Sequence, residues 1–153
     1  MPITTKLNSE SYLTDCPQIL LEFIKGYIPD VDIVFTLPIL DEKTELLRPI
    51  LFLELRGEKG QAVGMGNVVS SNMRGEEQFL SYWAWWITMD GERKMFEVVQ
   101  KAQTLKMAFL QNKGELRSAG LMNPKISNFR QISGYPFCGG RQLITFQIML
   151  MWS

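Results

Sequence analysis

Apolar residues recur at helical spacing in two segments of the chain. The first segment follows Asp15 and ends near Gly26, and the second runs from Gly91 to Lys113. Their apolar stripes are formed by Ile19, Leu20, Phe23, Ile24 and Tyr27, and by Met95, Val98, Ala102, Leu105 and Phe109. This spacing predicts an N-terminal helix and one long helix. Gly114 stands where a left-handed residue would end the second helix.

Apolar and polar residues alternate with a period of two in other parts of the chain, which predicts strands. The segments are 32–37, 50–56, 125–132 and 141–152, and the last alternates most regularly. Together with the two helices, these strands predict an α+β fold. We expect a mostly antiparallel sheet with the N-terminal helix and the long helix packed on one face.

Residues 78–89 are the most distinctive segment and read Gln-Phe-Leu-Ser-Tyr-Trp-Ala-Trp-Trp-Ile-Thr-Met. The aromatic content predicts a strand covered on both faces. One face would carry Tyr82, Ala84 and Trp86, and the other Trp83, Trp85, Ile87 and Met89. A single long helix covers only one face, so Trp83, Trp85, Ile87 and Met89 are candidate subunit-interface residues. Packing in the core is the alternative for these tryptophans.

Glycines punctuate the region between the second and third predicted strands, residues 57–77. A connection of this length inside a compact domain is typically functional or disordered. The region therefore predicts a flexible loop, with a hairpin arm through residues 61–70 as the alternative.

Length and charge bound the function classes. The 153 residues predict a single domain over 1–153, in which residues 1–14 form a polar leader. Sixteen basic and sixteen acidic residues give zero net charge, and no Lys or Arg lies between residues 78 and 89. We therefore expect no specific nucleic-acid binding. No apolar run reaches the length of a membrane span, and residues 1–15 lack the apolar stretch of a secretory signal, so we expect no membrane association.

The chain contains no histidine, which removes the commonest general base and metal ligand. Cys16 and Cys138 consequently have no histidine partner for thiol catalysis or for a metal site. We expect two buried or idle thiols, with a long-range disulfide between them as the alternative. The Gly64-Met65-Gly66 stretch lacks the remaining glycine and the helix of a dinucleotide site. We predict no enzyme activity, no cofactor and no metal.

The order of elements resembles that of the tail terminator, or tail-completion, proteins of long-tailed bacteriophages and prophages. The likeness lies in a strand that opens Arg48-Pro49-Ile50-Leu51-Phe52-Leu53, and in an aromatic strand that leads directly into a helix, as in residues 83–113. A closing strand of the kind Leu143-Ile144-Thr145-Phe146-Gln147-Ile148 completes it, so the resemblance covers residues 16–152.

This resemblance implies a structural protein of the virion tail that is assembled in the cytoplasm of the bacterial host. The chain would associate with itself in a ring, typically a hexamer. The ring would cap the tail tube and join it to the head, with tube and head-connector proteins as partners. The 57–77 region would then order on docking, and the docking candidates within it are Lys59, Met65, Asn67, Asn72 and Arg74.

A second hypothesis comes from a different class of protein. The chain would be a small-molecule or peptide-binding adaptor domain that uses the aromatic strand as a pocket wall. It predicts a concave apolar site near Trp83 and Trp85.

Overall fold

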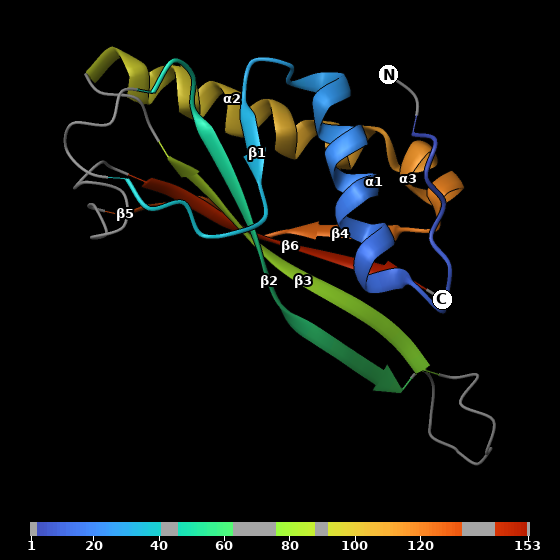
Figure 1. Cartoon of the computed structure of the whole chain (residues 1–153). Coiled ribbons are helices and arrows are strands. Elements are labelled where there is room, and N and C mark those ends of the chain that lie inside the picture. Colours follow the sequence, from blue (N-terminus) through green and yellow to red (C-terminus); the bar gives the residue numbers. More distant parts are fainter. Residues whose placement is uncertain (1–2, 41–45, 63–75, 88–91, 133–142, 153) are drawn as a thin grey trace.

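The computed structural model describes residues 3–40, 46–62, 76–87, 92–132 and 143–152 (Figure 1). These residues form three helices and six strands. In chain order, the elements are α1 (Tyr12–Tyr27), β1 (Asp32–Val34), β2 (Ile50–Ala62), β3 (Glu76–Ile87), α2 (Glu92–Gln111), α3 (Lys113–Ala119), β4 (Met122–Ile126), β5 (Arg130–Ile132) and β6 (Leu143–Trp152).

The six strands belong to one sheet, in the order β1-β2-β3-β6-β4, and β5 also pairs with β6. β1 runs parallel to β2, and every other described pairing is antiparallel. The helices lie on one face of this sheet, while the β2–β3 hairpin continues past them (Figure 1). The predicted α+β class, with a mostly antiparallel sheet, is therefore confirmed.

The helices differ from their predicted boundaries. α1 begins at Tyr12, before Asp15, because Asp15 Oδ2 accepts hydrogen bonds from Asn8 N at 3.0 Å and Ser11 Oγ at 2.6 Å. The predicted long helix is α2, which ends at Gln111 rather than at Lys113, and a short third helix, α3, follows with Gly114 inside it. The left-handed stop is instead Gly120, with φ of 104°.

The strands also differ from the sequence pattern. The strand predicted over 125–132 is divided between β4 and β5, and the one predicted over 32–37 keeps only its first three residues. β2 extends to Ala62 and β3 begins at Glu76, so both ends of the 57–77 region are strand. A β-bulge between Leu55 and Gly57, where Gly57 has φ of 150°, bends β2 as it enters this hairpin.

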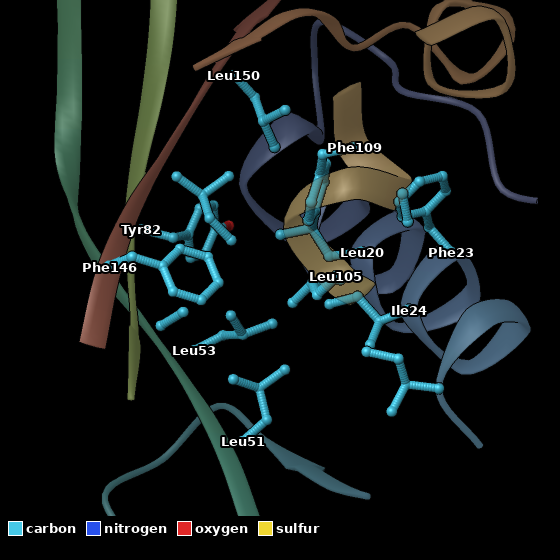
Figure 2. Close-up of a cluster of buried hydrophobic side chains, with 14 of the residues drawn as sticks. Leu20, Phe23, Ile24, Leu51, Leu53, Tyr82, Leu105, Phe109, Phe146 and Leu150 are labelled. Atoms are coloured by element: carbon cyan, nitrogen blue, oxygen red, sulfur yellow. The ribbon is translucent and has the colours of Figure 1, made fainter. Parts of the chain in front are cut away.

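The main core lies between the helices and the sheet, and Figure 2 shows its two sides facing each other. α1 and α2 contribute Leu20, Phe23, Ile24, Leu105 and Phe109. The sheet contributes Leu51, Leu53, Tyr82, Trp86, Phe146 and Leu150. These residues are the predicted apolar stripes and the predicted inner face of the aromatic strand, which explains why the fold class follows from the pattern.

The N-terminal segment before α1 packs against this core. Ile3 and Leu7 contact the buried cluster, and Leu7 N donates a hydrogen bond to the Ala119 carbonyl at 2.8 Å. The Glu22 carboxylate of α1 also accepts hydrogen bonds from the main-chain N–H and hydroxyl groups of both Thr4 and Thr5. The described part of the predicted polar leader is thus fixed to the domain at several points.

Candidate functional site

The candidate site lies on the face of the sheet that points away from α1 and α2. We call this the outer face. The register places Glu54, Trp83 and Gln147 side by side on β2, β3 and β6, and Phe52, Trp85 and Thr145 in the adjacent row. Residues that oppose one another across strands share a face. Aromatic and polar residues from three strands therefore meet here.

Four of these side chains form one connected group, the Trp83–Trp85 cluster, made of Glu54, Arg56, Trp83 and Trp85. Trp85 Nε1 donates a hydrogen bond to Glu54 Oε1 at 3.0 Å, and Arg56 Nε lies 3.4 Å from the same oxygen. The Arg56 guanidinium stands over the Trp83 ring, 5.7 Å from its centroid. The centroids of the two indole rings are 6.1 Å apart. These contacts restrict the rotamers of all four side chains.

The cluster remains partly open to solvent. Both tryptophans are partly exposed, and the Glu54 and Arg56 side chains are 34% and 49% exposed. Trp and Arg are the residue types that most often dominate the binding energy of protein interfaces. Restricted rotamers lower the entropy that such residues lose on binding. The cluster consequently has the composition and the pre-organisation of an interface centre.

Ile87, a second interface candidate, is fully buried within the chain. It packs with Ile50 and Leu143 in a small second cluster, which Val34, Leu40 and Leu46 also contact. Residues that follow β1 therefore cover this end of the outer face. Trp83 and Trp85 remain accessible, Ile87 does not, and Met89 lies outside the described residues.

The docking candidates are distributed differently. Lys59 lies on β2 opposite Phe79 of β3, in the part of the hairpin beyond the bulge. Met65, Asn67, Asn72 and Arg74 lie outside the described residues.

The opposite end of the outer face is also closed by contacts within the chain. Gln147 Nε2 donates a hydrogen bond to Ser81 Oγ at 2.7 Å. Phe79 is 4% exposed, and Lys125 Nζ of β4 lies 5.3 Å from its ring centroid. The open part of this face is therefore centred on Trp83 and Trp85.

Groups with shifted pKa values lie away from the cluster. Burial raises the pKa of the Cys16 thiol to about 12, and burial also raises the pKa of Tyr82. Both residues belong to the main core on the helical side of the sheet. Hydrogen bonds from Thr5 and Thr4 lower the pKa of Glu22 to about 2. The shifts of Cys16 and Tyr82 arise from burial, and that of Glu22 arises from its hydrogen bonds to Thr4 and Thr5. Among these three groups, no acid and base converge on one site.

Two clefts lie on the helical side. One, of about 540 Å³, is bounded by the end of α1, residues 47–49 and α2, and the other, of about 470 Å³, follows α2 further. Their shared lining is formed by Tyr27, Gln100 and Thr104. Neither cleft includes Trp83 or Trp85. Neither is therefore the concave apolar site that the adaptor hypothesis predicts near these two residues. Within the described ranges, no group of three or more Cys, Asp or Glu side chains is placed to hold a metal ion.

Sequence reasoning identified Trp83 and Trp85 but missed Glu54 and Arg56. These two residues alternate with leucines on β2, and that alternation was the available signal. The partner strand and its register could not be derived from the alternation, because both depend on long-range pairing.

No protein-family model and no curated protein sequence matches this chain. Among the helices of the described residues, none is long and apolar enough to cross a membrane.

Proposed function

We propose that the protein is a structural component of a phage or prophage tail, of the tail-terminator type. Copies of the chain would form a ring, a hexamer in the typical case, that caps the tail tube and joins it to the head. The protein would be found in the virion after assembly in the host cytoplasm. It would act by binding and shape, without catalysis, cofactor or metal.

The observation that carries this proposal is the Trp83–Trp85 cluster on the outer face. The helices cover one face of the sheet, and the cluster leaves two tryptophans and an arginine partly exposed on the other. In a ring, burial of this cluster against a neighbour would supply the centre of the subunit contact. Closed symmetry repeats one such contact around the whole ring.

The β2–β3 hairpin supports a separate docking role. It extends away from the helices and carries Lys59 opposite Phe79 (Figure 1). An element that projects from the body of a subunit can reach the tube or the head while the rest of the subunit remains in the ring. We assign the docking candidates Lys59, Met65, Asn67, Asn72 and Arg74 to this role as part of the proposal.

Light scattering over a concentration series, with and without assembled tail tubes, tests the ring. We expect a discrete species near six subunits at high concentration or on the tubes, and electron microscopy should show capped tube ends. Trp83→Ala should reduce this assembly at least tenfold. Phe96→Ala is the matched control, because Phe96 is 75% exposed on α2 and lies outside the cluster.

Two results would contradict the proposal. The first is a monomer at every concentration that also leaves tube ends uncapped. The second is equal assembly by the wild type and Trp83→Ala. A change of tryptophan fluorescence on titration with small molecules or peptides, by a chain that stays monomeric, would instead favour the adaptor hypothesis.

A further inference from the structure

The edge of β2 is partnered over only part of its length. β1 pairs with Ile50, Leu51 and Phe52, and within the described residues no strand pairs with the same edge beyond Phe52. The edge from Leu53 to Glu58 therefore presents main-chain N–H and C=O groups that can bind another extended strand.

The opposite edge of the sheet is much less suited to pairing. β4 contains Pro124, which has no N–H to donate, and Asn123, which has φ of 47°. Its register with β6 also shifts between Met122 and Lys125. Features of this kind blunt an edge strand against further pairing. The edge of β2 is thus better suited to accept a strand than the edge at β4.

The direction of the main chain indicates where such a strand would pair. Asp32 N donates a hydrogen bond to the Pro49 carbonyl at 3.0 Å, so this carbonyl points toward the edge. Because successive residues of a strand alternate in direction, the N–H and C=O of Leu53 and Leu55 also point outward. Two copies of β2 that run antiparallel can therefore exchange a pair of hydrogen bonds between their Leu55 residues.

The side chains around Leu55 are complementary to themselves in this arrangement. Antiparallel pairing centred on Leu55 places Glu54 of each copy opposite Arg56 of the other. Glu54 and Arg56 lie on the same face, since they form an ion pair and Arg56 stands over Trp83. Directly opposed residues that do not exchange hydrogen bonds bring their side chains closest. Both charge pairs would consequently be attractive, and Leu55, 44% exposed, would meet its own copy on the other face.

We propose that the protein, before it forms the ring, is a two-fold dimer joined along the edge of β2, with a second copy of the chain as the occupant. The paired run is Glu54–Arg56, centred on Leu55. It is limited on one side by β1, which occupies the edge at residues 50–52, and on the other by Gly57, which follows the bulge and pairs with Ser81 of β3. This dimer goes beyond the proposed ring, because it concerns the protein before it docks on a tail.

Charge exchange across the pair tests the dimer. At each place where residue 54 of one copy faces residue 56 of the other, Glu54→Arg puts two positive charges opposite each other. Arg56→Glu puts two negative charges at the same places. Each variant alone should weaken dimerisation at least tenfold, as measured by sedimentation equilibrium, because like charges face each other. An equimolar mixture of the two should dimerise again, and so should the double variant Glu54→Arg/Arg56→Glu.

Lys101→Glu is the matched control, since it changes the net charge as Arg56→Glu does but lies on α2. It should dimerise like the wild type, and circular dichroism of every variant should show an intact fold. Three results would overturn the dimer: a wild type that stays monomeric, single variants that pair normally, or folded single variants that do not pair when mixed. Failure to cap tail tubes with pairing intact would overturn the ring alone.

Discussion

Trp85 and Trp86 are neighbours in sequence but lie on opposite faces of β3. Trp86 is fully buried in the main core, whereas Trp85 belongs to the partly exposed cluster on the outer face. The alternation of the aromatic strand predicted this division, and the described residues confirm it for Tyr82, Ala84 and Trp86. It also makes adjacent substitutions report on different properties of the protein.

Trp86→Ala should lower the free energy of unfolding by about 3–5 kcal/mol, because it leaves a cavity in the core. Trp83→Ala should cost less than about 2 kcal/mol, since its side chain is already partly hydrated. Urea denaturation of both variants measures the difference. Trp86→Phe is the control: Trp86 Nε1 is buried without a hydrogen-bond partner, so this variant should lose much less than Trp86→Ala. Equal losses for Trp83→Ala and Trp86→Ala would contradict the assignment of faces.

Glu22 gives the fold a dependence on acid pH. Its pKa is lowered to about 2 in the folded protein, mainly by the Thr5 hydroxyl, from an ordinary value of 4.5. The unfolded chain therefore binds the proton first as the pH falls. The stability that Glu22 contributes is present above about pH 4.5 and is lost progressively toward pH 2.

Glu22→Gln should remove this contribution, since an amide cannot accept all of the hydrogen bonds from Thr4 and Thr5. We expect its melting temperature to fall less steeply than that of the wild type between pH 4.5 and 2. The amide protons of Thr4 and Thr5 should also exchange faster at pH 6. Glu10→Gln, a change at an exposed glutamate before α1, should retain the pH profile of the wild type. If the melting temperatures of Glu22→Gln and the wild type fell in parallel with pH, the stabilising role of the hydrogen bonds from Thr4 and Thr5 to Glu22 would be contradicted.

At the scale of elements, Gly114 within α3 and Gly120 at its end behave differently. Gly120 has φ of 104°, and a Cβ there would lie 2.9 Å from Leu7 Cβ. Gly120→Ala should therefore destabilise the protein by about 1–3 kcal/mol. Gly114 lies within α3 with open space around it, so Gly114→Ala should stabilise by about 0.5–1 kcal/mol. Thermal unfolding of both variants checks the opposite signs, and stabilisation by Gly120→Ala would contradict the left-handed stop.

The elements also show the limits of the sequence pattern. The helical stripes predicted α1 and α2 because both helices bury one continuous apolar face. The short helix α3 that follows Gln111 was not predicted. There, Asn112 turns its side chain back, and Nδ2 donates a hydrogen bond to the Ala108 carbonyl at 3.0 Å. A local side-chain contact of this kind leaves the apolar spacing unchanged, so periodicity cannot detect it.

At the scale of the whole molecule, Cys16 can report on global unfolding. The residue is fully buried, and burial raises the pKa of its thiol to about 12. In a Cys138→Ser variant at pH 8, Cys16 should therefore react with a thiol reagent only as fast as the protein unfolds. Chemically denatured protein is the control and should react at once. Equal rates for the native and denatured protein would contradict the burial of this thiol.

The same residue gives the molecule a dependence on alkaline pH. Above about pH 9, the thiol ionises in the unfolded chain but remains protonated in the folded one. The unfolded state therefore becomes favoured as the pH rises toward 12, and Cys16→Ala should flatten that part of the stability profile.

The class of the sheet was predicted, but the order of its strands was not. The composition and periodicity of the strands indicated an antiparallel sheet with helices on one face. The strand order did not follow from them, because β6, the last described strand, lies between β3 and β4. For the same reason, the contacts of Glu54 and Arg56 with the two tryptophans could not be derived from the sequence. The placement of Trp83 and Trp85 on the face of β3 opposite to the core could be.

The central place of β6 has a consequence for synthesis of the protein. A nascent chain that has been translated only as far as residue 142 contains β3 and β4 but lacks the strand that lies between them. The helices and the β2–β3 hairpin can form from residues already made, whereas β4 and β5 pair only with β6 among the described strands, so we expect the sheet to be completed after residues 143–152 leave the ribosome. A chain cut short before this point would leave one edge of β3 unpaired, which makes it a suitable substrate for chaperones and proteases.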